Sequence, residues 1–250
     1  MAELQNRWGA QAQTRTAGVA IDEGLRAYML RVYNYMGLGI AFTAIVTLLM
    51  INNPEVMRAV ARGPMMWVLF AGVLGLGWFA HKIIYSGSQA LAHGAYWLYC
   101  ALWGALISPM IYSFIAKGAG GLVFQALAIT AVTFGAVSLF GYLTKKSLSA
   151  FATFFAIASI GLLVAMVVNA IFVQSTGMSL LVSCGVVVLF AAITAWETQE
   201  IKQMYIEGAT GGAGEVFITR SAIFGAFLLY GSFVTLFTNI LTILGIMRSD

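Results

Sequence analysis

Residues 189–245 decide the fold of this chain, because they contain two long apolar runs joined by one short charged loop. The first run ends in FAAITAWETQEIKQMY, residues 190–205, and the second is SAIFGAFLLYGSFVTLFTNILTILGIM, residues 221–247. A helix needs about 20 apolar residues to cross a bilayer, and the second run exceeds that length without a charged residue. We therefore expect it to span a membrane and the upstream segments to pack around it.

Glu197 is the first charged residue after the apolar part of the first run. An isolated charge in hydrocarbon costs about 2.5–3.5 kcal/mol even on the lenient insertion scale. Glu197 must therefore either lie at the water interface, where it is simply solvated, or find a partner inside the protein. The sequence leaves both interpretations open, and the second makes Glu197 the first candidate for a functional residue.

The composition is that of an integral membrane protein. The chain has 250 residues, of which 61% are hydrophobic and 9% charged, and its mean hydropathy is +0.91. A soluble domain carries about 25% charged residues. We predict an all-α integral membrane protein whose transmembrane domain, residues 29–250, has seven spanning helices at residues 33–51, 65–85, 95–116, 122–143, 151–173, 179–199 and 217–247.

Residues 1–28 are expected to form a polar N-terminal tail. They contain no apolar run and mix both charge signs, so they do not resemble a secretory signal peptide. We expect this tail to be partly disordered or to lie along the membrane interface.

The basic residues predict the orientation of the chain in the membrane. They lie in the loops and the tail, so their excess over the acidic residues indicates topology and not a nucleic-acid partner. Cytoplasmic loops carry most lysines and arginines, which predicts a cytoplasmic N-terminus, an outward C-terminus and a position for Glu197 near the cytoplasmic mouth. The side of the N-terminus has Arg7, Arg15, Arg26, Arg31, Lys82, Lys145, Lys146, Lys202 and Arg220, and the other side has Arg58, Arg62, Lys117 and Arg248.

Little in the sequence supports catalysis. The two histidines, His81 and His93, have no accompanying GxSxG sequence, and Cys, His and carboxylate residues do not cluster as a metal centre requires. We therefore expect no enzyme activity and no cofactor. An intramembrane acid with nearby polar groups is instead typical of a proton or cation pathway.

Three segments resemble the Bax inhibitor-1 family, also called the transmembrane Bax inhibitor motif proteins. AWETQEIK, residues 195–202, is similar to the family signature DTQxIK, and LLYGSFVTLFTNILTILGI, residues 228–246, is similar to the family's last helix. WGALISPMIYSF, residues 103–114, is similar to its GxxLSP segment. The resemblance implies two layers of three helices around a central C-terminal helix, and a pH-sensitive calcium leak. The compact loops and short tail favour a member from a bacterial inner membrane.

The resemblance also implies site residues. The family has two facing aspartates, which map onto Glu197 and Ser232, and a basic residue that helps to close the pair, which maps onto His81 or Lys82. Ser232 departs from the family pattern, and one carboxylate alone cannot titrate as a coupled pair. Our hypothesis is that a pH switch here pairs Glu197 with His81. Calcium prefers about six to eight oxygen ligands, so Glu197 alone should bind it weakly and transiently.

Two classes of function remain open from the sequence. The first is a cation leak gated by protonation, with calcium or another cation as the permeant and membrane lipid as the surrounding partner. The second is a membrane interaction protein, because the resemblance includes bacterial relatives that modulate a membrane-anchored ATP-dependent protease, and the tail offers a handle for one. Deleting the residues before Arg26 separates them, since a handle predicts loss of partner binding and a leak predicts intact flux.

Overall fold

The computed structural model describes the backbone of residues 2–62, 64–86 and 88–249, and the side chains of residues 22–60, 64–86 and 88–248. Its regular elements are all helical. They are α1 (Ala2–Ile51), α2 (Pro54–Arg62), α3 (Met65–Ser86), α4 (Gln89–Ala116), α5 (Gly120–Leu143), the 3-10 turn η1 (Ser149–Phe151), α6 (Ala152–Val168), the π-helical turn η2 (Asn169–Val173), α7 (Thr176–Thr210) and α8 (Glu215–Ser249).

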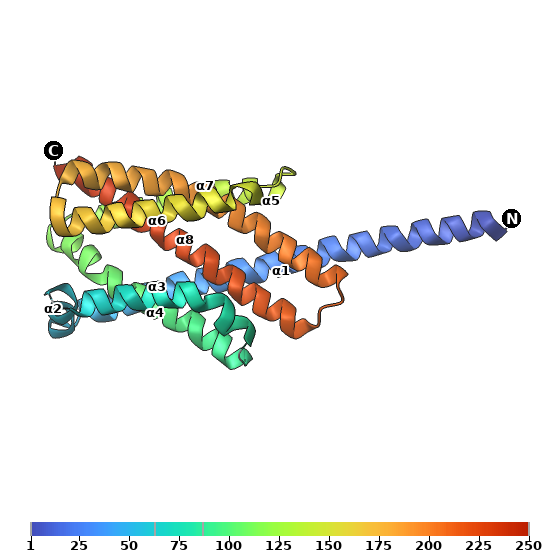
Figure 1. The fold of residues 1–250 in the computed structure, drawn as a ribbon. Helices are drawn as coiled ribbons and strands as arrows, with labels where there is room; N and C mark the ends of the chain where they lie inside the picture. The colour runs from blue at the N-terminus through green and yellow to red at the C-terminus, as the bar shows by residue number, and fades with distance from the viewer. Residues whose placement is uncertain (1, 63, 87, 250) are drawn as a thin grey trace.

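The helices form two layers with α8 between them. α1, α3 and α4 make one layer, α5, α6 and α7 make the other, and α8 crosses between the two (Figure 1). α8 contacts both layers, through α1, α3 and α4 on one side and α5 and α7 on the other. This arrangement confirms the bundle that the family resemblance implies.

α8 lies at the centre of the bundle, and its long uncharged stretch allows it to be buried there. A helix with no polar face has to be buried by other helices or by lipid. Between Arg220 and Arg248 it has no charged residue, and it contributes many of the fully buried side chains of the core. These include Ile223, Leu229, Tyr230, Leu236 and Leu241.

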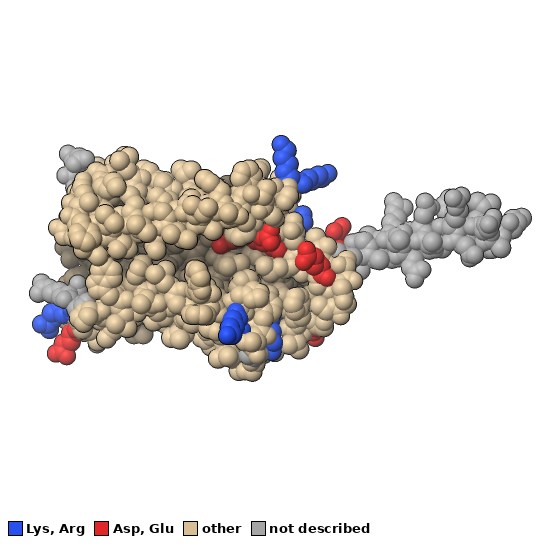
Figure 2. Space-filling view, in the orientation of Figure 1, with Lys and Arg blue, Asp and Glu red and all other residues tan. Residues whose placement is uncertain are grey.

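Seven helices of the described chain are long and apolar enough to cross a membrane, which confirms the predicted number. The two termini lie at opposite ends of the bundle, as an odd number of spans requires (Figure 1). The face shown in Figure 2 has a broad uncharged band suited to contact with lipid, and acidic side chains lie in the hollow between the layers. The predicted ends differ most at the first, third and sixth spans, where the helical segments begin at Asp22 and Gln89 and end at Thr210.

The sixth span was predicted to end at residue 199, and this was wrong. α7 continues to Thr210, so the motif ETQEIK lies inside a helix and not at its end. The prediction stopped where polar residues accumulate, but these residues find partners on neighbouring elements, as the site below shows. The short α2 was not predicted, although the apolar residues Val56, Met57 and Val60 recur at helical spacing in its sequence.

Of the predicted tail, residues 1–28, the structure describes the backbone of residues 2–28, which belong to α1. The side chains of residues 1–21 lie outside those that the structure describes. The expectation of a disordered or interfacial tail concerns these residues and stays a prediction. Leu25 and Tyr28, near the end of the predicted tail, are buried in the core. The helical segment able to span the membrane begins at Asp22.

Pro109 lies inside α4 and removes one helical hydrogen bond. The carbonyl left without its donor is that of Ala105, four residues earlier. The hydroxyl of the fully buried Ser108 donates to this carbonyl at 2.8 Å. The Ser-Pro pair therefore carries its own replacement donor, as a proline inside a membrane helix requires.

α5 and α7 approach each other closely at Gly141. A Cβ atom on Gly141 would overlap the backbone of Ala195, including its carbonyl oxygen. Small residues at such contacts let helix backbones pack together in lipid, where the hydrophobic effect does not drive helix association. This contact sets the position of α7 just before Glu197.

Candidate functional site

The structure brings Glu197 of α7 and Ser232 of α8 together in the core. The Ser232 hydroxyl donates a hydrogen bond to Glu197 Oε2 at 2.7 Å. The two side chains are only 8% and 2% exposed. Of the two interpretations that the sequence leaves open for Glu197, the internal partner is the one observed.

The contact lies deep in the bundle and not at its mouth, where Glu197 was expected. Val234, two residues from Ser232, is fourteen residues from both Arg220 and Arg248, so Ser232 stands close to the middle of the uncharged part of α8. The buried carboxylate is therefore near the centre of the apolar part of the central helix. Ionisable groups at such depth are usually functional.

Aromatic side chains close the space around this contact. On one side, Tyr99 of α4 packs against Gly231 of α8. A Cβ atom added to Gly231 would lie 3.0 Å from the Tyr99 hydroxyl oxygen. The Tyr99 ring stacks on Phe227 with ring centroids 4.0 Å apart. On the α5 side, Phe134 meets Phe233 edge to face at 5.5 Å. In this conformation the carboxylate is enclosed by protein.

A chain of hydroxyl groups, buried at Thr198 and Ser138 and half-buried at Tyr33, starts one residue after Glu197. Thr198 Oγ1 lies 2.9 Å from Ser138 Oγ of α5, and Ser138 Oγ lies 2.7 Å from the Tyr33 hydroxyl of α1. Thr198 donates to the Thr194 carbonyl of its own helix. These bonds join α1, α5 and α7 beside the acid and fix the rotation of α7 that turns Glu197 toward α8.

The rest of the ETQEIK motif attaches α7 to the loop between α5 and α6. Gln199 Oε1 accepts from the Leu148 amide at 2.7 Å, and its Nε2 donates to the Lys146 carbonyl at 2.9 Å. Ser149 donates to Glu200 at 2.7 Å. The Lys202 ammonium donates to the carbonyl of Tyr142, a residue near the end of α5.

His81 and Lys82 do not reach the acid in this structure. Both side chains are exposed, and the His81 ring packs on Tyr85 and Phe224, with centroids 4.8 and 5.4 Å away. Phe224 precedes Ser232 by eight residues, which is roughly 12 Å along a helix axis. In the described part of the chain, no hydrogen bond or ion pair joins either residue to Glu197, so the expected Glu197–His81 pair is not formed here.

The site offers few ligands to a metal ion. Glu197 brings two carboxylate oxygens, and Ser232 adds one hydroxyl oxygen. No group of three or more His, Cys, Asp or Glu residues converges among the side chains that the structure describes. This set falls short of the six to eight or so oxygens that calcium prefers and suits weak, transient contact with a cation.

Comparison with known proteins identifies the family. The family model described as inhibitor of apoptosis-promoting Bax1 matches residues 25–249, which is almost the whole chain and includes both Glu197 and Ser232. The chain belongs to the Bax inhibitor-1 family. This confirms the resemblance carried by residues 103–114, 195–202 and 228–246.

Several bacterial members of the Bax inhibitor-1 family are similar to this chain over most of its length. An uncharacterized protein of Deinococcus radiodurans is 37% identical over 221 residues, 88% of this chain and 90% of that protein. An uncharacterized protein of Rickettsia prowazekii is 31% identical over 237 residues, 94% of this chain and 96% of that protein. The Escherichia coli inner membrane protein YbhL is 30% identical over 226 residues, 90% of this chain and 94% of YbhL.

Sequence reasoning missed Tyr99, Ser138 and Gln199 as neighbours of the acid. Gln199 carried a signal, since it lies within the family motif next to Glu197. Ser138 and Tyr99 carried none, because each lies in an apolar run whose spacing gives no information about which distant helix it meets.

Proposed function

We propose that this member of the Bax inhibitor-1 family provides a passive, pH-sensitive leak for cations across its membrane, with Glu197 on the pathway. The observation that carries the proposal is the buried hydrogen bond from Ser232 to Glu197. An acid this deep in a membrane bundle has little structural purpose, because an apolar residue would pack there at lower cost. The calcium leak implied by the family resemblance supports the same function.

The conformation described above is the closed one in this proposal. Glu197 accepts from Ser232, and the rings of Tyr99, Phe134 and Phe233 fill the space around the pair. Opening separates α7 from α8 at this contact and lets water and a cation reach the carboxylate. α7 and α8 both contribute polar side chains along the way, so a separated interface has groups to line it.

The proposed pH dependence has a definite sign. Deprotonated Glu197 is a charge in a low-dielectric core, which disfavours the closed arrangement by up to about 2.5–3.5 kcal/mol. The same charge attracts a cation once the pathway opens. Both effects act in one direction, so flux rises as the pH rises and Glu197 loses its proton.

The permeant cation is held loosely in this proposal. A single carboxylate and one hydroxyl cannot replace the full oxygen shell of calcium, so a passing ion keeps most of its water. We therefore propose limited preference for calcium over monovalent cations. Replacing Ser232 by aspartate would restore two acids at the contact and favour calcium.

The proposed setting is a bacterial inner membrane with the N-terminus in the cytoplasm. The excess of lysines and arginines at the N-terminal side supports this orientation. The name of the related YbhL places that protein in the inner membrane of Escherichia coli.

Flux in liposomes tests the proposal. The purified protein is reconstituted around a calcium-sensitive or potassium-sensitive dye, and the rate of ion entry is measured at several pH values. Glu197→Gln should lower the rate by on the order of tenfold, the factor that about 1.4 kcal/mol of lost cation attraction gives, and should remove its pH dependence. Ser232→Asp should raise the calcium rate relative to potassium.

Two control variants sharpen this experiment. Glu200→Gln removes the other acid of the motif, which bonds to Ser149 on the α5–α6 loop, and should leave flux unchanged. His81→Ala should leave the pH profile unchanged, since His81 does not contact Glu197. Absence of flux in wild type and in every variant would reject the leak, and an equal loss in Glu200→Gln would reject the special role of Glu197.

The interaction function remains a separate candidate that the same preparation can test. Removing the residues before Arg26 should leave flux intact if the leak proposal holds. Loss of association with a membrane-anchored ATP-dependent protease after this deletion, with flux unchanged, would add a partner to the leak without replacing it.

A further inference from the structure

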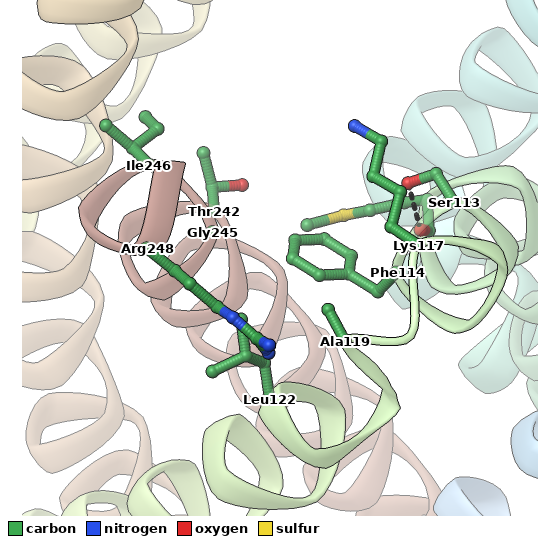
Figure 3. Close-up of a pocket in the computed structure, with 10 residues that line it drawn as sticks. Ser113, Phe114, Lys117, Ala119, Leu122, Thr242, Gly245, Ile246 and Arg248 are labelled. Atoms are coloured by element: carbon green, nitrogen blue, oxygen red, sulfur yellow. Dashed lines mark hydrogen bonds between the residues drawn. The ribbon is translucent and has the colours of Figure 1, made fainter. Parts of the chain in front are cut away.

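A cavity of about 430 Å³ lies at the C-terminal end of α8, opposite the N-terminal end of the bundle. Its walls come from α4, α5 and α8, so it stands where the two layers meet the central helix (Figure 3). Pockets that hold small molecules have volumes of about 300–1,000 Å³. The cavity is therefore large enough for a polar headgroup.

Two cationic side chains from different helices face this cavity. Lys117, which caps the C-terminus of α4, and Arg248, in the last turn of α8, line the cavity from different helices, and their charged ends are directed to different parts of it (Figure 3). The described residues that line the cavity include no acid, and neither cation has an ion-pair partner in the described part of the chain. Two positive charges around one hollow whose described lining includes no acid favour an anion.

The hydroxyl groups of the cavity are arranged as acceptors. Thr242 donates its proton to the Thr238 carbonyl at 2.8 Å, and Ser113 donates to the Met110 carbonyl at 2.7 Å. Their oxygen lone pairs remain available to a hydroxyl group of a ligand. The cavity thus offers charge for a phosphate and acceptors for an alcohol.

The remaining walls are apolar and continue onto the outer surface. Met110, Phe114 and Leu122 line the cavity, and the nearby residues Ile115 and Met247 are 48% and 67% exposed. A ligand with its anion at the cations would meet apolar surface at the end of helices that span the membrane. Phospholipids combine these two properties at this depth.

A plainer explanation exists for each cation taken alone. Lysine and arginine at helix C-termini interact favourably with the helix dipole, by about 0.3–1 kcal/mol in exposed positions. That accounts for a cation at each helix end but not for two cations lining one cavity whose described residues include no acid. On the side of the membrane opposite the N-terminus, the predicted topology places only two other basic residues, Arg58 and Arg62.

We propose that this cavity binds the phosphate headgroup of an anionic phospholipid from the leaflet opposite the N-terminus. Lys117 and Arg248 are long, exposed side chains that turn toward the phosphate from the α4 and α8 sides. The hydroxyl oxygens accept from the alcohol of the headgroup. The bound lipid joins α4 and α5 to α8 and so ties the two layers together at this end. The proposal is independent of the leak.

Thermal unfolding of the detergent-solubilised protein, followed by tryptophan fluorescence, tests this site. Short-chain phosphatidylglycerol is titrated and compared with short-chain phosphatidylcholine and inorganic phosphate. Phosphatidylglycerol should raise the unfolding midpoint of wild type, whereas the other two should not. The double variant Lys117→Gln with Arg248→Gln should need on the order of 30-fold more lipid for the same shift, from about fivefold per cation.

Matched variants distinguish the loss of a cation in the cavity from a general loss of stability. Arg58→Gln removes a cation at the same end outside the cavity and should respond as wild type does. Lys117→Arg keeps the charge and should keep the shift, and Lys117→Gln alone carries the test, with about a fivefold loss, if the double variant fails to fold. Equal shifts with phosphatidylcholine, a full response in the double variant, or the same shift with inorganic phosphate alone would each overturn the proposal.

Discussion

At the scale of single residues, the contact between Glu197 and Ser232 differs in kind from a pair of acids. A serine hydroxyl can donate to a carboxylate in every protonation state, whereas an aspartate donates only when it is protonated. Ser232 therefore satisfies one oxygen of Glu197 without a shared proton. The proton count of the site is set by one group, which should give a simple titration of function.

Removing the Ser232 donor should destabilise the protein measurably. Ser232→Ala leaves a buried carboxylate oxygen without its partner, at a cost of about 1–3 kcal/mol. Thr235→Ala is the matched control, because the Thr235 hydroxyl only donates to Gly231 of its own helix. Thermal unfolding should show a lower midpoint for Ser232→Ala than for Thr235→Ala, and equal midpoints would mean that the hydrogen bond contributes nothing.

The sequence predicts part of this site for a physical reason. Glu197 can be found because a charge next to an apolar run violates the composition of a membrane helix. Ser232 can be found only through the family resemblance, since serine is common in membrane helices. Tyr99 cannot be found, because its contact with Gly231 depends on how α4 packs against α8 and no local pattern encodes that packing.

At the scale of helices, α7 both spans the bundle and attaches itself to α5 and to the loop after it through polar side chains near its C-terminus. Its apolar part was predicted, but the predicted span ended at residue 199, where polar residues accumulate, and α7 continues to Thr210. The side chains of Gln199, Glu200 and Lys202 each bond to α5 or to the loop after it, so the polar residues hold the helix in place. Solvent exposure could not be judged from polarity alone.

The Gln199 side chain should hold the α5–α6 loop. Gln199→Ala removes the acceptor of the Leu148 amide and the donor to the Lys146 carbonyl. Hydrogen exchange at Leu148 should become faster in this variant. Gln203→Ala, one turn further along α7, should leave this exchange unchanged, and an unaltered Leu148 in Gln199→Ala would refute the attachment.

The close approach of α5 and α7 gives a prediction with a control on the same helix. Gly141→Ala places a methyl group on the backbone of Ala195 and should cost about 1–3 kcal/mol as an overpacked contact. Gly135→Ala meets no atom within 4 Å and should be neutral or slightly stabilising, because alanine favours a helix. Unfolding midpoints that fall equally in both variants would contradict the contact.

At the scale of the whole molecule, the number of spans followed from composition, and the layers followed from the family. Hydropathy finds each long apolar run because lipid demands one. It gives no information on which helix lies at the centre, because α4, α5 and α6 also lack Asp, Glu, Lys and Arg and are not central. Glu197 of α7 contacts α8 near the middle of that central helix, and this contact links the fold to the proposed leak.

The central claim is that the contact between Glu197 and Ser232 opens when the protein conducts. Access to position 232 tests this most directly, in a Ser232→Cys variant with Cys100 and Cys184 replaced by alanine. A small water-soluble reagent attacks the thiolate, so its rate at position 232 is divided at each pH by its rate at the exposed Cys184 of the wild type. This ratio should be high at the higher pH values at which flux is measured and fall toward zero at the lower pH values at which flux stops. Flux that persists at a pH where the reagent never reaches position 232 would contradict the account.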